Sequence, residues 1–235
     1  MPAERTIEII PVSGIGEVSR GDDLATLLVE NAHLSELDVV VVTQKIVSKA
    51  EGRLVASNPL DPTARENLIQ RESVRILRRR DELFVTETPH GFICANAGVD
   101  WSNVDDGWAA ILPADPDRSA RRIRDGIKAQ TGHNVGVVIS DTFGRPWRRG
   151  LTDVAIGCAG VAAIVDLRGT TDTKGRELFA TEVCVADELA GAAELVMGKS
   201  RGVPAAIVRG ADESWFRRSS VATEIVRPAG EDLFR

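Results

Sequence analysis

The strongest constraint on the fold of this chain is the run Asp38-Val39-Val40-Val41-Val42-Thr43. Successive side chains of an extended strand point to opposite faces, so this run is apolar on both faces. Such a strand is typical of the centre of a sheet that is covered on both sides. We therefore predict that residues 38–43 form a buried central strand.

The rest of the chain alternates irregularly between strand and helix patterns, which predicts an α/β or α+β fold with mixed sheets. Further strands are expected over residues 6–10, 83–86, 92–95, 135–139 and 204–208. Helices are expected after Asp23, over 62–80, from a cap at Ser119 to Gly132, over 154–164 and over 187–197. No change in composition marks a linker, so we expect one domain over residues 1–235, with a hinge near 113–118.

Composition excludes several classes of protein. Hydrophobic residues make up 43% and charged residues 27% of the chain, which is a globular balance and not that of a disordered one. No apolar run is long enough to span a membrane.

The net charge of -6 argues against nucleic acid as a partner, although a local basic cluster could still bind a small anion. The cysteines Cys94, Cys158 and Cys184 are scattered, so we expect no disulfide framework, no zinc cluster and a cytoplasmic protein.

A polar segment follows the predicted strand at 135–139. We expect a turn to begin at Ser140-Asp141, where Asp141 and Thr142 offer the oxygen ligands that Mg²⁺ and Mn²⁺ prefer. Arginines follow closely, and guanidinium groups suit phosphate or carboxylate; they are Arg145, Arg148 and Arg149. The alternative interpretation is a solvated turn with a charged rim.

Two other polar segments also follow predicted strands. Asp100 and Asn103 lie after the strand at 92–95, and an acid there could join Asp141 in holding a pair of divalent ions on phosphate oxygens. An ordinary turn bonded by its own side chains is the alternative. Lys49 follows the central strand and could reach a phosphate, or could be a solvated lysine at a helix start.

Taken together, these segments resemble the coenzyme F420-0:L-glutamate ligase family, also called F420:γ-glutamyl ligase. The resemblance extends from Thr6 to about Gly210. Four stretches carry it: residues 38–53, residues 97–104 with Ala-Gly-Val-Asp-x-Ser-Asn-Val, residues 140–157 with Asp-Thr-x-Gly-Arg-x-x-Arg-x-Gly, and residues 184–198. Residues 227–234 look most like the actinobacterial form, in which a nitroreductase-like domain often follows the ligase domain.

The resemblance implies an activity and a fold. The family adds γ-linked L-glutamate to the precursor coenzyme F420-0, through an acyl phosphate, while GTP becomes GDP and phosphate. Two Mg²⁺ or Mn²⁺ ions are implied, with K⁺ as a further candidate ion. The family fold has two lobes of mixed α/β structure and forms an intertwined homodimer.

The resemblance also implies roles for single residues. The implied metal ligands are Asp100, Asp141 and Thr142. The implied nucleotide contacts are Ile15, Gly16, Glu17, Val18, Gln44, Lys49, Asn103, Gly198, Lys199, Ser200 and Arg201. Our own hypothesis adds Arg145 and Arg148 to Asp141 as catalytic residues, with Arg149 beside them, for the anionic substrate.

One position departs from the family pattern. Some archaeal members place a glutamate where this chain has Lys199, and a charged lysine cannot ligate a metal. A second ion would then depend on Asp141, Thr142, water and phosphate. Two other functions stay open: a protein that binds F420 or a nucleotide without turnover, and a metal-dependent GTP hydrolase.

Overall fold

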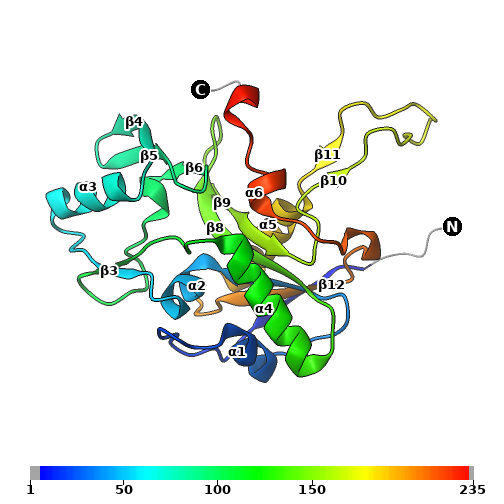
Figure 1. Ribbon diagram of the computed structural model, residues 1–235, viewed down its shortest axis with the longest axis horizontal. Coiled ribbons are helices and arrows are strands. Elements are labelled where there is room, and N and C mark those ends of the chain that lie inside the picture. The colour runs from blue at the N-terminus through cyan, green and yellow to red at the C-terminus, as the bar shows by residue number, and fades with distance from the viewer. Residues whose placement is uncertain (1–5, 233–235) are drawn as a thin grey trace.

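The computed structural model describes residues 6–232, and a five-stranded mixed sheet lies at its centre (Figure 1). The strand order is β1 (Glu8–Val12), β12 (Ala205–Arg209), β2 (Val39–Thr43), β8 (Gly136–Gly144) and β9 (Leu151–Ala159). Only β2 and β8 are parallel neighbours. The four valines of β2 are 0% exposed, which confirms the predicted central strand.

Helices cover both faces of this sheet. The helices α1 (Leu24–Asn31) and α4 (Pro116–Thr131) pack together in front of it in Figure 1, with α4 against β8 and β9. The helix α5 (Val185–Met197) covers the opposite face, and the short α6 (Val221–Glu224) contacts β9. The α/β class with mixed sheets is therefore confirmed.

A smaller set of elements lies beside the sheet, on the left in Figure 1. A second cluster of buried residues, which includes Leu68, Val99 and Ile111, forms its core. The elements are the β3 (Leu54–Ala56) and β7 (Trp108–Ala110) pair, α3 (Pro62–Arg71), the sheet of β4 (Arg75–Arg80), β5 (Leu83–Glu87) and β6 (Ile93–Ala95), and the 3-10 turn η1 (Asn96–Gly98). The helix α2 (Gln44–Ala50) lies between this set and the sheet, and its Ile46 and Val47 belong to the main core. The two lobes and the homodimer stay predictions.

The third part of the fold is a hairpin arm that projects from the sheet, at the upper right of Figure 1. Its base is the antiparallel pair β10 (Val165–Asp166) and β11 (Glu182–Val183). The last part of the described chain also contains the 3-10 turns η2 (Glu213–Trp215) and η3 (Ala229–Glu231). Residues Leu233 and Phe234, part of the segment that resembles the actinobacterial form, lie outside the described residues.

The helix predicted over 154–164 is wrong, because residues 151–159 form β9. A short apolar run buried on both faces fits a helix and a strand equally well by its periodicity. The tertiary structure decides it: β9 pairs antiparallel with β8 while α4 and α5 pack on its two faces. The polar turn predicted at Ser140 is wrong for the same reason, because β8 continues to Gly144.

The single helix predicted over 62–80 is also wrong. The helix α3 ends at Arg71, and residues 75–80 pair with β5 as a strand. Such a helix would bury Leu68, Ile69, Val74, Ile76 and Leu77 on one face. Leu68 and Ile69 are buried, Leu77 is half-buried, and Val74 and Ile76 are exposed. β-Branched Val74 and Ile76 favour the strand, and pairing with β5 fixes it.

Helix α4 begins earlier than expected. Its N-cap is Asp115, whose side chain accepts the backbone N–H of Arg118 at 2.9 Å, and Pro116 opens its first turn. Ser119, the predicted cap, is therefore inside the helix. The predicted end at Gly132 is confirmed, with φ of 80°.

The expected hinge near 113–118 coincides with the start of α4. The buried Asp117 carboxylate accepts backbone N–H groups from Cys158 at 2.8 Å, Val221 at 2.9 Å and Ala222 at 3.1 Å. These bonds tie the first turn of α4 to β9 and α6. The hinge itself stays a prediction.

No helix between residues 6 and 232 has both the length and the apolar run that crossing a membrane requires.

Candidate active site

One edge of the central sheet gathers loops from distant parts of the chain. The strands β1, β2 and β8 run toward this edge and β12 starts from it, because β12 is antiparallel to β1 and β2 while β8 is parallel to β2. The edge holds a cavity of about 480 Å³. This volume lies in the range of small-molecule sites.

The cavity lining includes most residues that were assigned from the sequence. Those residues are Ile15, Gly16, Glu17, Val18, Gln44, Lys49, Asp100, Asn103, Asp141, Thr142, Gly198, Lys199 and Ser200. Three charged residues that the sequence did not single out also line the cavity, Lys45, Asp153 and Glu194, together with the hydroxyl of Ser102. The two polar segments that were expected to converge, around Asp100 and Asp141, thus meet at one cavity.

A β-bulge sets the direction of the β8 side chains at the cavity. The β8–β9 register shifts between Ile139 and Ser140, so that one extra residue of β9 lies between the two pairing positions. Bulges of this kind re-aim side chains and are frequent beside active sites. Beyond the shift, Thr142 pairs with Asp153 across the hairpin.

Asp153 is a buried carboxylate at the floor of the site. It is 2% exposed and accepts hydrogen bonds from Ser140 Oγ at 3.0 Å and Thr142 Oγ1 at 2.7 Å. The sequence alone does not single out Asp153, because a helix predicted over 154–164 leaves no strand opposite Thr142. Reading the segment after Gly150 as the return strand of a hairpin would have put Asp153 opposite Thr142.

Asp100 is held by a lysine that follows the central strand. Lys45 Nζ lies 2.8 Å from Asp100 Oδ2 and also donates to Ser102 Oγ at 2.8 Å, while the Ser102 N–H donates to Asp100 Oδ1 at 2.7 Å. Burial opposes the charged carboxylate, yet Lys45 and Ser102 lower the pKa of Asp100 below its usual value. Asp100 is therefore ionised at neutral pH.

Asp141 has a different environment from Asp100. Burial, together with the negative charges of Asp100 and Asp153, raises the pKa of the Asp141 carboxyl to about 7, although the Thr142 N–H and Lys199 act in the opposite direction. Among residues 6–232, no cationic side chain forms an ion pair with Asp141. The cavity therefore has one acidic group whose charge the protein leaves without a direct counter-ion.

Lys49 connects the helix α2 to the loop that follows β1. Its ammonium pairs with the Glu17 carboxylate, and its side chain is buried. On the same helix, Ser48 Oγ lies 2.9 Å from Gln44 Oε1 and donates to the Ile111 carbonyl at 2.7 Å. These bonds hold Gln44 and the loop 15–18, both of which line the cavity.

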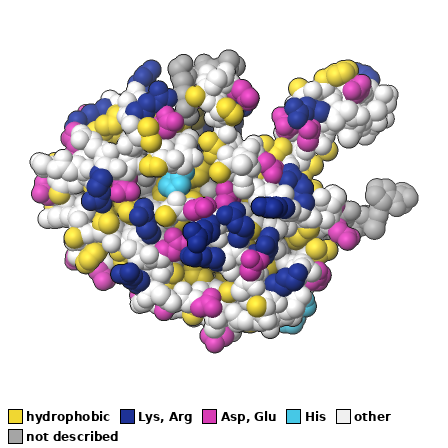
Figure 2. Space-filling view, in the orientation of Figure 1, with side chains coloured by type: hydrophobic (Ala, Val, Ile, Leu, Met, Phe, Trp, Pro, Cys, Tyr) yellow, Lys and Arg dark blue, Asp and Glu magenta, His cyan; other side chains and the backbone are white. Residues whose placement is uncertain are grey.

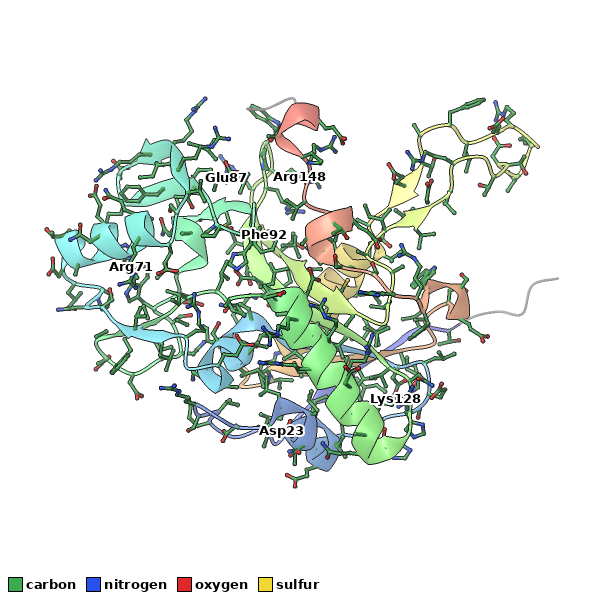
Figure 3. The ribbon with its side chains drawn as sticks, viewed as in Figure 1. Asp23, Arg71, Glu87, Phe92, Lys128 and Arg148 are labelled. Carbon is green, nitrogen blue, oxygen red and sulfur yellow. The ribbon has the colours of Figure 1, made fainter. Side chains whose placement is uncertain are left out.

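The arginine candidates do not line this cavity. Arg145, Arg148 and Arg149 are exposed at the tip of the β8–β9 hairpin, where Figure 3 shows Arg148. Arg201 is also exposed and is not part of the lining. The single chain thus brings the two acids and the lysines together but leaves these four arginines outside, and their roles stay predictions.

The family of this chain follows from comparison with known proteins. Residues 14–210 match the family described as F420-0:Gamma-glutamyl ligase. The chain belongs to that family. The F420-0:gamma-glutamyl ligase family is a family of ligases, so the chain is a ligase enzyme.

Two relatives from this family match nearly the whole length of this chain. The coenzyme F420:L-glutamate ligase of Methanothermobacter thermautotrophicus is 42% identical, covering 97% of this chain and 99% of its own. The protein of the same name from Methanopyrus kandleri is 42% identical over 98% of each chain. The similarity to the actinobacterial form stays a prediction.

Proposed function

We propose that this chain is a GTP-dependent ligase that adds γ-linked L-glutamate to coenzyme F420-0 through an acyl phosphate. The name of its archaeal relatives supports the two substrates. The observation that carries the proposal is the meeting of Asp100 and Asp141, from distant segments, at one cavity that lysines also line.

The oxygen groups of the cavity suit a divalent cation that is shared with a nucleotide. Asp141 lies among acidic groups, with its pKa raised to about 7 by burial first and then by Asp100 and Asp153, so a cation here would relieve the excess negative charge. Residues 6–232 contain no cluster of three or more His, Cys, Asp or Glu side chains able to hold an ion by themselves. Mg²⁺ is ordinarily held by one or two carboxylates together with substrate phosphates, which matches Asp100 and Asp141. When bound, such an ion would neutralise charge on the phosphate oxygens.

The residues of the chain would act mainly by binding and orientation. A carboxylate is a poor acyl donor to an amine until phosphorylation gives it a good leaving group. In the first step the carboxylate oxygen of F420-0 attacks the γ-phosphorus, and the bond to the GDP oxygen breaks. In the second step the glutamate amine attacks the acyl carbon, phosphate leaves, and the amine loses a proton. Positioning and charge neutralisation supply most of the catalysis of phosphoryl transfer.

Lys45, Lys49 and the loop 15–18 would hold the nucleotide. Lys49, buried beside Glu17, and Lys45, beside Asp100, place ammonium groups at the cavity wall. An ammonium acts on a phosphate as a point charge. The loop 15–18 also lines the cavity, and its backbone N–H groups are candidate donors to the phosphates.

A mass measurement tests the function. The protein is incubated with F420-0, GTP, L-glutamate and Mn²⁺, and the products are weighed. A gain of one glutamyl unit with release of GDP is the expected result. Release of GDP without that gain would indicate the hydrolase, and no reaction with retained ligand binding would indicate the binding protein.

A substitution at Asp141 tests the site. Asp141→Asn should slow product formation at least ~30-fold, because roughly 2 kcal/mol or more of transition-state charge stabilisation is lost. The fold should persist, since asparagine is nearly the same size and the Asp141 charge has no ion-pair partner among the described residues. Asp125→Asn, an exposed acid on α4, is the matched control and should retain full activity. An unchanged rate in Asp141→Asn would remove this residue from the reaction.

A further inference from the structure

Lys199 occupies a position where three oxygen groups converge. Its ammonium donates to Thr142 Oγ1 and to Asp153 Oδ1, the latter at 2.8 Å, and lies 3.1 Å from Glu194 Oε1. The three oxygens come from β8, β9 and α5. A hydroxyl and two carboxylates are also the ligand types of a hard divalent cation.

The backbone holds Lys199 at this place. Helix α5 ends at Met197 and is capped by Gly198, whose N–H donates to the Glu194 carbonyl at 3.0 Å and whose φ is 61°. A side chain at that φ would be strained, so glycine allows the chain to turn back toward β8 directly after the helix. Lys199 thereby reaches the Glu194 carboxylate from the next turn of the chain and Asp153 from the neighbouring strand.

The ammonium is the counter-ion of Asp153. That carboxylate is 2% exposed, and among the described residues Lys199 is its ion-pair partner. The Lys199 side chain itself is 56% exposed and lines the cavity. An ammonium bonded to these oxygens and a divalent ion bonded to the same oxygens exclude each other.

We propose that Lys199 supplies the second positive charge of the phosphate site, so that this ligase binds one divalent ion per chain and not two. The proposal rests on the proposed function, because it assumes a nucleotide at the cavity. Asp100 and Asp141 would hold the single divalent ion. The Lys199 ammonium would occupy the position between Thr142, Asp153 and Glu194.

The number of bound ions tests the proposal. Mn²⁺ binding to the whole protein with saturating GDP is measured by equilibrium dialysis and by electron paramagnetic resonance. We expect one Mn²⁺ per wild-type chain and no signal from coupled ions. Two Mn²⁺ per wild-type chain, with the coupled spectrum of neighbouring ions, would overturn the proposal while leaving the ligase function intact.

Substitutions at Lys199 complete the test. Lys199→Gln frees the three oxygens, so a second Mn²⁺ should bind and the coupled spectrum should appear. Lys199→Arg keeps the positive charge and should stay at one ion. Lys128→Gln removes the same charge from the exposed last turn of α4 and should also stay at one.

A Lys199→Gln variant that folds, as judged by its circular dichroism, and still binds one Mn²⁺ would contradict the proposal. If Lys199→Gln fails to fold, two ions on Lys199→Arg would contradict it and one ion would support it. A wild-type chain that binds neither GDP nor Mn²⁺ would instead overturn the nucleotide site on which both proposals depend.

Discussion

At the scale of single residues, burial controls which groups of this chain can react. Burial raises the pKa of the Cys94, Cys158 and Cys184 thiols to about 12, with nearby carboxylates such as Asp117 beside Cys158 adding to the effect. Asp100, by contrast, stays ionised because Lys45 and Ser102 outweigh its burial. Burial without a cationic partner thus suppresses ionisation, whereas the partly buried Asp100 stays charged because Lys45 pairs with it.

The thiols provide a direct check of this rule. A pKa of about 12 means that the thiolate appears only as the pH approaches 12, so at pH 8 its fraction is roughly a thousandfold below that of a free cysteine. We expect all three thiols of the native protein to react with a disulfide reagent correspondingly slowly. In concentrated guanidinium chloride they should react at the rate of free cysteine. A native thiol that reacts at the free rate at pH 8 would contradict this expectation.

At the scale of elements, the contact between α4 and β9 depends on a glycine. A Cβ at Gly157 would lie 2.4 Å from the Pro116 carbonyl carbon and 2.6 Å from its oxygen, both of them backbone atoms. The first turn of α4 is also tied to β9 by Asp117. The helix therefore packs on the strand at a distance that only glycine allows.

Gly157→Ala should consequently separate α4 from β9. We expect a loss of about 1–3 kcal/mol in the free energy of unfolding, measured by urea denaturation, as for other overpacked cores. Gly230→Ala is the matched control, because no heavy atom lies within 4 Å of the Cβ it would introduce. Its stability should change by less than about 0.5 kcal/mol. Equal midpoints for the two variants would refute the close contact.

At the scale of the whole molecule, the cavity joins segments that are far apart in the chain. Its lining runs from Ile15 in the loop after β1 to Pro204 before β12. The net charge is -6, yet Figure 2 shows lysine and arginine side chains gathered over α4, so the charge is unevenly distributed. A ligand in the cavity would bridge the central sheet, α5 and the loop at 100–103.

Ligand binding should therefore stabilise the entire fold. At concentrations ~100 times the Kd, GDP with Mn²⁺ should add about 2.7 kcal/mol to stability and raise the Tm by roughly 5–10 °C. Differential scanning calorimetry with and without EDTA measures the shift. EDTA should remove most of it, and Asp141→Asn should reduce it. A shift that is the same with and without EDTA would show that no divalent ion takes part.

Local patterns were sufficient for the elements and groups that depend on neighbouring residues alone. Val39–Val42 predict the central strand because four apolar side chains need cover on both faces. Gly132 predicts the end of α4 because glycine readily adopts the left-handed conformation found there. Asp141 and Lys49 could be selected because polar residues near the ends of adjacent buried strands tend to meet at one sheet edge. Asp100 follows β6, which belongs to another sheet, so only the tertiary structure brings it to the same cavity.

The tertiary structure alone decided the features that depend on pairing. Residues 151–159 are a strand and not part of a helix because β8 offers a partner and two helices cover the faces. That pairing, with its bulge, brings Asp153 opposite Thr142 and completes the oxygen set around Lys199. A short apolar run fits the periodicity of a helix and that of a strand equally well. Contacts with residues distant in the sequence therefore decide between the two structures.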